Sequence, residues 1–193
     1  MKRSIIKLLL LLAACLPTLG TAQTILVFGD SLSAAYGIPR EQGWVALLQR
    51  ARPDLKVVNA SISGETAAGG LRRLDAALRQ HRPDLVLLEL GANDGLRGRP
   101  VPDIEHDLAE LIRRSQHAQA RVVLLGMQLP PNYGADYTRD FRALYPKLAQ
   151  RYRTALVPFL LAHIPPEQFQ ADDLHPGVAA QAQIVRNVSP ALP

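Results

Sequence analysis

The sequence is poor in cysteine and in aromatic residues. Its one cysteine is Cys15, and Phe, Trp and Tyr together make up 5% of the 193 residues. Because Cys15 lies close to the N-terminus, disulfides, thiolate catalysis and cysteine-ligated metals are excluded from the rest of the chain. No basic cluster interleaved with aromatic residues occurs, so we do not expect nucleic-acid binding.

No apolar run is long enough to cross a membrane. A crossing helix needs roughly 20 apolar residues, whereas the run 8–16 ends at Pro17. Three basic residues precede this run, and the small residues Gly20-Thr21-Ala22 follow it. This is the pattern of a signal peptide. We therefore expect residues 1–22 to be removed and residues 23–193 to function in the periplasm or outside the cell.

A second form of export fits the same segment. Leu12-Ala13-Ala14-Cys15 resembles the cleavage box of bacterial lipoproteins, in which Cys15 would become the lipidated first residue. Cleavage after Ala22 is favoured, because the small residues before it directly precede the first predicted strand. An intact mass beginning at Cys15 and including acyl chains would instead establish the lipoprotein.

Several common functional motifs are absent. The chain has no G-x-S-x-G elbow, no glycine-rich nucleotide-binding loop and no H-E-x-x-H helix. The net charge of +5 falls to +2 for residues 23–193, because Lys2, Arg3 and Lys7 belong to the predicted signal peptide. Four histidines show no paired metal-ligand spacing: His81, His106, His117 and His163. We expect neither a metal nor another cofactor.

From residue 23 onward, apolar strand-like runs alternate with helix-like segments. The predicted strands are 24–28, 56–59, 85–90, 121–127 and 155–159, and the predicted helices are 43–50, 67–80, 102–118, 138–151 and 178–188. This alternation predicts an α/β protein, a single-domain three-layer α/β/α sandwich with a parallel sheet of about five strands. Its crevice should lie beyond the carboxyl ends of the strands, flanked by predicted loops at 91–102 and 129–134.

Residues suited to catalysis follow the first three predicted strands. Ser31 follows the first strand, and Gly29 before it lets the backbone turn while the hydroxyl projects into the crevice. Gly64 follows the second strand, where a backbone amide can approach a developing negative charge. Asn93 follows the third strand and offers an amide donor. Each residue type is also common in turns and helix caps, so none of them alone assigns a function.

An acid and a histidine stand close together near the C-terminus. Asp172 precedes His175 by three residues, within one local turn. Its carboxylate can hold one ring nitrogen and leave the other for a serine, which makes an acid–base pair for nucleophilic catalysis. Asp173 places a second acid beside the first.

Together these segments resemble the SGNH, or GDSL-like, hydrolases, in particular the secreted multifunctional esterase, thioesterase I and lysophospholipase L1 group of Gram-negative bacteria. The resemblance extends from Ile25 to about Pro176. It rests on Gly29-Asp30-Ser31-Leu32-Ser33, Asn59-Ala60-Ser61-Ile62-Ser63-Gly64, Glu89-Leu90-Gly91, Asn93-Asp94-Gly95-Leu96-Arg97-Gly98, Leu129-Pro130, Asn132-Tyr133-Gly134 and Tyr145-Pro146-Lys147-Leu148.

The resemblance implies a flavodoxin-like fold and a catalytic triad. Ser31 would be the nucleophile, His175 the general base and Asp172 the acid that orients it. The oxyanion hole would consist of the Ser31 amide, the Gly64 amide and the Asn93 side chain. Asp173 departs from the glycine of similar proteins and leaves open whether it shares the role of Asp172.

The resemblance also implies a small-molecule acyl ester or thioester as substrate, including lysophospholipids and aryl esters. We expect the acyl groove to be lined by residues of the two predicted loops: Leu96, Leu129, Pro130 and Tyr133. A carbohydrate O-acetylesterase on the same fold is the alternative activity, and an exported binding module with a structural serine and histidine is the alternative class. The oligomeric state stays open, and a monomer is compatible with the sequence.

Overall fold

The computed structural model describes residues 22–193, so the predicted signal peptide lies outside the described residues except for Ala22. The described chain contains a five-stranded sheet in the order β2-β1-β3-β4-β5, with every neighbouring pair parallel. Its strands are β1 (Thr24–Gly29), β2 (Lys56–Asn59), β3 (Leu85–Glu89), β4 (Arg121–Leu125) and β5 (Ala155–Val157). The predicted parallel sheet is confirmed.

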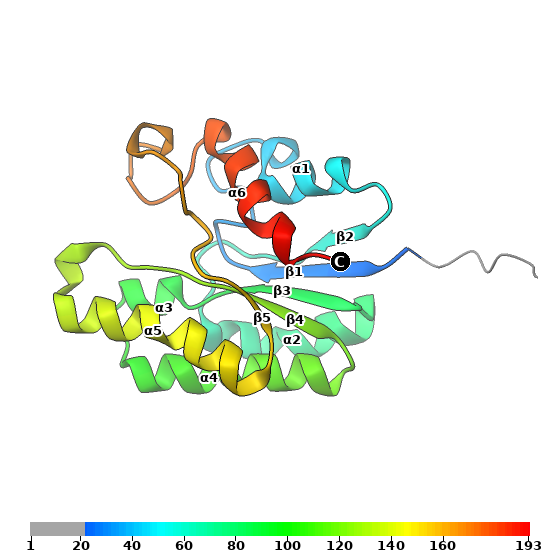
Figure 1. The fold of residues 1–193 in the computed structure, drawn as a ribbon, viewed down its shortest axis with the longest axis horizontal. Coiled ribbons are helices and arrows are strands. Elements are labelled where there is room, and N and C mark those ends of the chain that lie inside the picture. Colours follow the sequence, from blue (N-terminus) through cyan, green and yellow to red (C-terminus); the bar gives the residue numbers. More distant parts are fainter. Residues whose placement is uncertain (1–21) are drawn as a thin grey trace, which may run out of the picture.

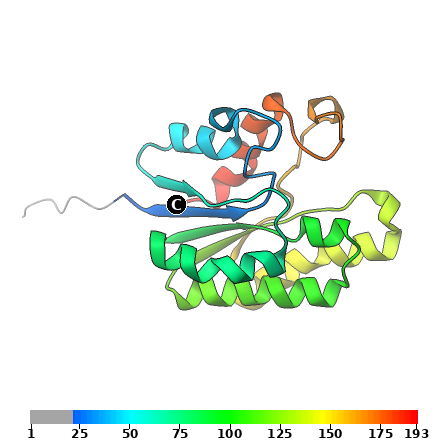
Figure 2. The ribbon, with the colours of Figure 1, turned by 180° about the vertical axis from the view of Figure 1, so that it is seen from behind.

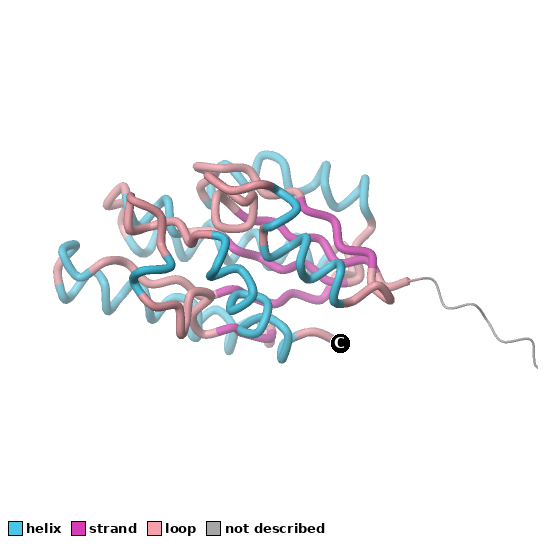
Figure 3. The backbone as a smooth tube through the Cα atoms, turned by 90° about the horizontal axis from the view of Figure 1, so that it is seen from above, coloured by secondary structure: helices cyan, strands magenta, loops and turns pink. Residues whose placement is uncertain are grey.

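Helices cover both faces of this sheet. One face carries α1 (Trp44–Ala51) and α6 (Gln181–Val188), and the other carries α2 (Ala67–His81), α4 (Val101–His117) and α5 (Ala135–Tyr152) (Figure 1; Figure 2, from behind). Seen from above, the strands lie side by side beneath α1 and α6 (Figure 3). The three-layer sandwich is therefore also confirmed. No helix in residues 22–193 combines the length and apolar character that a membrane crossing requires.

Burial on both faces explains the composition of the central strands. In β1, Ile25, Leu26, Val27 and Phe28 are all fully buried, as expected for a parallel strand covered by helices on each side. On α4 the buried apolar residues recur at helical spacing, which turns one stripe toward the core. Each such side chain contributes roughly 1.5–3 kcal/mol on burial.

The predicted loop at 91–102 was wrong, because part of it is a short helix, α3 (Ala92–Leu96). Gly91, with φ of 107°, lets the chain turn sharply after β3. The Asp94 carboxylate accepts the backbone N–H of Ala67, the first residue of α2, at 2.8 Å and a hydrogen bond from Arg99 at 3.0 Å. These two bonds, to residues outside α3, stabilise a helix in an Asn-Asp-Gly sequence that is more typical of a turn.

The order of the strands in the sheet determines where a ligand crevice can form. From β1 the chain first extends the sheet to β2 and then returns to pair β3 with the other side of β1. The order therefore reverses between β1 and β3, which is where open α/β sheets form their ligand crevice. The carboxyl ends of both strands, the loop after β2 and the segment before α6 meet at this edge, on the left in Figure 1.

Candidate active site

Ser31 lies directly after β1 and faces the C-terminal histidine. Its Oγ is 2.8 Å from Nε2 of His175, across 144 positions of sequence. The turn is held locally, because Oδ1 of Asp30 accepts the backbone N–H of Leu32 at 3.1 Å and the Asp30 carbonyl accepts that of Ala34 at 2.9 Å. Ser31 is buried, with 8% of its surface exposed, so the hydroxyl is presented by a fixed turn.

Asp172 holds the other side of the histidine. Its Oδ2 is 2.7 Å from Nδ1 of His175, and its Oδ1 accepts the backbone N–H groups of Leu174 and His175 at 3.0 and 2.9 Å. The backbone hydrogen bond from His175 is the main reason why the pKa of Asp172 falls to about 2. Asp172 is therefore ionised at neutral pH. It orients Nδ1–H toward itself and leaves Nε2 to accept the serine proton.

Asp173 is placed differently from Asp172. It adopts a left-handed backbone with φ of 56°, and its N–H donates to the carbonyl of Gln170. Among the described residues no hydrogen bond joins its side chain to His175, although Asp173 lines a cleft that Ser31 and His175 also line.

The backbone N–H groups of Ser31 and Gly64 lie at this edge and have no acceptor among residues 22–193. Gly64 has φ of 77°, a conformation that favours glycine, and a Cβ there would meet no atom within 4 Å. Unengaged amides beside a nucleophile are suited to stabilise a developing oxyanion.

The Asn93 side chain connects the turn that contains Ser31 with the loop that contains Gly64. Its Nδ2 donates to Oδ2 of Asp30 at 2.9 Å and to the carbonyl of Glu65, the neighbour of Gly64, at 3.0 Å. Both amide protons are thus engaged within the protein. A substrate oxygen at this position must share one of them.

A cleft of about 360 Å³ opens over Ser31, Asn93 and His175. Most of its lining is apolar and comes from the end of α3, from the loops after β4 and β5 and from the segment before His175: Leu96, Met127, Leu129, Pro130, Phe159, Leu161, Phe169 and Leu174. Three of the four residues expected in an acyl groove line it. The fourth, Tyr133, does not line it. Its hydroxyl instead donates to the Leu96 carbonyl at 2.9 Å and supports the end of α3. Gly64 also lies outside the lining.

Sequence reasoning missed a pair of buried carboxyl groups beneath Ser31. Asp30 is 1% exposed and Glu89, at the end of β3, is 0% exposed. Burial raises the pKa of Asp30 to about 6 and the pKa of Glu89 well above its ordinary value. The signal in the sequence that could have identified this pair is Glu89 itself, a single acid at the end of the otherwise apolar strand β3. Tyr36 was missed as well, and its ring packs on that of His175 at 4.5 Å between centroids.

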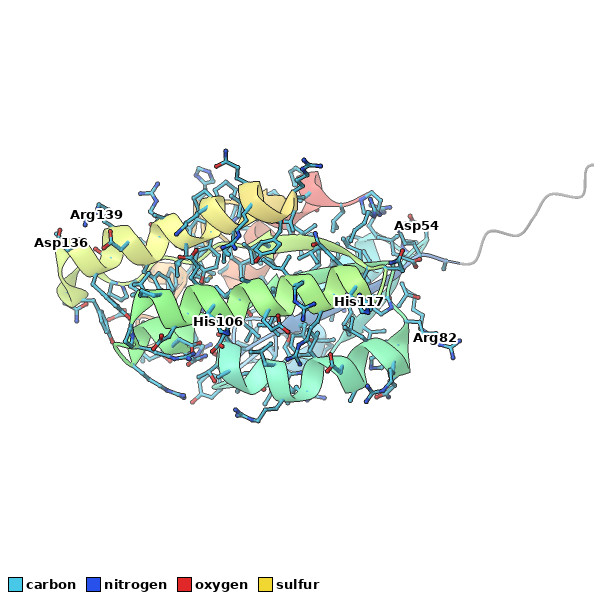
Figure 4. The ribbon with its side chains drawn as sticks, turned by 90° about the horizontal axis from the view of Figure 1, so that it is seen from below. Asp54, Arg82, His106, His117, Asp136 and Arg139 are labelled. Carbon is cyan, nitrogen blue, oxygen red and sulfur yellow. The ribbon has the colours of Figure 1, made fainter. Side chains whose placement is uncertain are left out.

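The remaining histidines lie away from this site. His106 and His117 are exposed on the outer side of α4 (Figure 4). Within the described range, no three His, Cys, Asp or Glu side chains gather in a way that could hold a metal ion. The histidine chemistry of the site thus depends on His175.

A serine joined through a histidine to an aspartate, beneath an apolar cleft at the switch point of a parallel sheet, has the arrangement of a serine hydrolase. The chain belongs to the GDSL-like lipase/acylhydrolase family, whose model matches residues 27–183. As a member of this family it is a carboxylic ester hydrolase. The resemblance found in the sequence is confirmed.

Characterised relatives cover most of the chain. Esterase TesA of Pseudomonas aeruginosa is 48% identical, over 95% of this chain and 96% of its own. Thioesterase 1/protease 1/lysophospholipase L1 of Escherichia coli is 44% identical, over 83% of this chain and 78% of its own. The crystal structure of the psychrotrophic esterase EstA from Pseudoalteromonas, inhibited by monoethylphosphonate, is 43% identical and superposes with a TM-score of 0.84, covering 88% of this chain and 96% of that one.

Proposed function

We propose that this protein is a serine esterase and thioesterase that cleaves acyl esters, including aryl esters and lysophospholipids, through an acyl-enzyme on Ser31. The observation that carries the proposal is the hydrogen-bonded series Ser31, His175 and Asp172 at the floor of an apolar cleft. The names of the relatives, an esterase and a thioesterase/lysophospholipase, support the same substrate classes.

The geometry supports a two-step reaction. Nε2 of His175 takes the proton of Ser31 while Oγ attacks the carbonyl carbon, since an unactivated serine is a weak nucleophile at neutral pH. The negative oxygen of the tetrahedral intermediate lies against the amides of Ser31 and Gly64 and the side chain of Asn93. Its collapse releases the alcohol or thiol, which receives the proton from His175. Water then hydrolyses the acyl-enzyme by the same proton transfers.

The cleft supports substrates with an acyl chain longer than acetyl. A volume of about 360 Å³ with a mostly apolar lining favours burial of methylene groups, each of which contributes roughly 0.8 kcal/mol. An acetylesterase acting on sugars would need polar groups for the carbohydrate hydroxyls, and the lining offers few. The acyl-ester activity is therefore preferred over carbohydrate O-deacetylation.

Export is part of the proposal. Residues 1–22 have the charge, apolar run and small-residue site of a signal peptide, so we place residues 23–193 in the periplasm or outside the cell. Expression of the full chain in a Gram-negative host, followed by intact-mass analysis, tests this. A mass beginning at Gln23 is expected, and an acylated mass beginning at Cys15 would replace this proposal with a lipoprotein.

The activity is tested with residues 23–193 on p-nitrophenyl esters from acetyl to palmitoyl and on acyl thioesters, with Ser31→Ala as the matched control. We expect turnover that extends past butyryl, stoichiometric labelling by an alkyl phosphonate, and loss of both in Ser31→Ala. Turnover of acetyl esters alone would favour deacetylation of sugars. No turnover and no labelling would contradict the proposed function.

A further inference from the structure

The buried carboxyl pair of Asp30 and Glu89 has no role in the reaction described above. Asp30 directly follows β1, within the turn that carries Ser31, and Glu89 is the last residue of the adjacent central strand β3. Gly29 makes room for them, because a Cβ at that position would lie 2.5 Å from Oε2 of Glu89. Burying two acids is costly, so their retention beside Ser31 calls for a reason connected with the site.

The hydrogen bonds of Glu89 are those of a protonated acid. Its Oε2 accepts the N–H of Asp30 at 3.1 Å and the hydroxyl of Ser33 at 2.9 Å. Its Oε1 is buried and has no hydrogen-bond partner among the described residues, so no donor stabilises a charge there. Burial and the charge of Asp30 raise the pKa of Glu89 well above its ordinary value. Glu89 is therefore neutral, and it holds Asp30 through the hydrogen bond that its Oε2 accepts from the Asp30 backbone N–H.

No lysine or arginine within residues 22–193 forms an ion pair with either acid. Arg73, which reaches the neighbouring Gly29 carbonyl, binds other groups. It binds Glu65 at 2.6 Å and donates to the carbonyls of Ala60 and Gly29. The charge of the pair is consequently held by neutral donors, of which one is the Asn93 amide.

Asn93 connects this pair to the oxyanion position. One of its amide protons goes to the ionised carboxylate of Asp30 and the other to the neutral carbonyl of Glu65. Hydrogen bonds to ionised groups are about twice as strong as those between neutral groups. A substrate oxyanion can therefore displace the Glu65 carbonyl, while the bond to Asp30 keeps the amide plane in place.

We propose that Asp30 and Glu89 are positioning residues that act through Asn93: Glu89 holds the backbone N–H of Asp30, and the Asp30 carboxylate aims at the substrate oxyanion the amide proton of Asn93 that the Glu65 carbonyl otherwise accepts. This role rests on the proposed ester hydrolysis at Ser31. Neither acid is hydrogen-bonded to the Ser31 hydroxyl or to the His175 ring, which bind each other and Asp172.

A double-mutant cycle tests the coupling to Asn93. In Asp30→Asn an amide N–H₂ competes with that of Asn93, so kcat should fall roughly 10- to 100-fold with KM within about twofold. In an Asn93→Ala background the same substitution should lower kcat by less than about twofold, because the residue through which it acts is gone. Equal losses in both backgrounds would overturn the proposal, since Asp30 would then act on Ser31 or on the fold.

A second pair of variants tests the proton on Glu89. Glu89→Gln is neutral and keeps an acceptor for the Asp30 N–H and the Ser33 hydroxyl, whereas Glu89→Leu keeps no acceptor. We expect Glu89→Leu to lose about tenfold or more in kcat and Glu89→Gln to recover most of that loss. A Gln variant as impaired as the Leu variant would mean that Glu89 acts as an anion, and would overturn its part in the proposal.

Phosphonate titration keeps these comparisons independent of folding. Rates are expressed per Ser31 that reacts, so a misfolded fraction does not count as lost kcat. If Glu89→Leu fails to fold, the Asp30 cycle still decides the coupling. If the wild type neither turns over esters nor reacts with the phosphonate, the proposed function is contradicted, and this role with it. If the wild type is active but Asp30→Asn lowers kcat equally with and without Asn93, only the positioning role is contradicted.

Discussion

Asp172 holds His175 at two places with one carboxylate. Oδ2 lies 2.7 Å from the ring nitrogen Nδ1, and Oδ1 accepts the backbone N–H of the same residue at 2.9 Å. Ring and backbone are therefore fixed relative to each other, and Nε2 is aimed at Ser31. The neighbouring acid, Asp173, has no such bond.

This asymmetry predicts that Asp172→Asn is far more damaging than Asp173→Asn. The asparagine oxygen has to stay with the two backbone N–H groups, which turns its N–H₂ toward Nδ1 and favours the wrong tautomer of His175. We expect kcat to fall on the order of 10⁴-fold. Asp173→Asn should stay within a few-fold, because asparagine tolerates the left-handed backbone at this position. Steady-state kinetics of both variants on one ester measure this difference in kcat. A larger loss in Asp173→Asn than in Asp172→Asn would assign the catalytic acid to Asp173.

The Asn93 amide predicts a second kinetic effect. Asn93→Ala removes one of the three donors that we propose for the oxyanion, so kcat should fall roughly 10²- to 10³-fold with little change in KM. Asn132→Ala is the control, because this residue is exposed on a neighbouring loop outside the cleft. An unchanged kcat in Asn93→Ala would remove Asn93 from the oxyanion hole.

Much of the fold was predictable because buried parallel strands and amphipathic helices have different apolar periods. The runs of β1 and β3 and the helical stripe of α4 are such cases. The short helix α3 was not predictable, because its stability comes from contacts of Asp94 with Ala67 and Arg99, which are distant in sequence or lie beyond the helix.

The site was predictable where its residues are local or follow a strand. Asp172 and His175 lie within one turn, and Ser31 follows β1, a strand that is clear from the sequence. The network through Asn93 was not predictable in the same way. Its partners Asp30 and Glu65 are 63 and 28 positions away, and which acceptor an amide binds depends on side-chain packing that no local pattern encodes.

The apolar cleft predicts a change in acyl-chain preference. Leu96→Trp places a larger side chain in a cleft of about 360 Å³ and so reduces the space left for an acyl chain. Activity on octanoyl and longer esters should therefore fall at least about tenfold relative to acetyl esters, because their methylene groups can no longer be buried there. Ile62→Trp is the control, because Ile62 is 51% exposed and lies outside the cleft. A parallel loss for all chain lengths in Leu96→Trp would mean that the acyl chain lies elsewhere.

The buried carboxyl of Asp30 predicts how stability depends on pH. Its pKa is raised from 3.8 to about 6, chiefly by burial, so between about pH 4 and pH 6 the folded state binds more protons than the unfolded state. The free energy of unfolding contributed by this group therefore falls as the pH rises through that window. Asp172 acts in the opposite sense, because its pKa of about 2 gives stability that is lost only as the pH falls below about 4.

Asp30→Asn isolates the first of these effects. Relative to wild type, the variant should gain on the order of 1–3 kcal/mol in the free energy of unfolding between pH 4 and pH 7, whatever constant offset its altered contact with Asn93 introduces. Urea unfolding at pH 4, 5, 6 and 7 measures the slope for both proteins. Parallel curves would mean that Asp30 is ionised in the folded state throughout this range, and that burial does not raise its pKa beside Glu89.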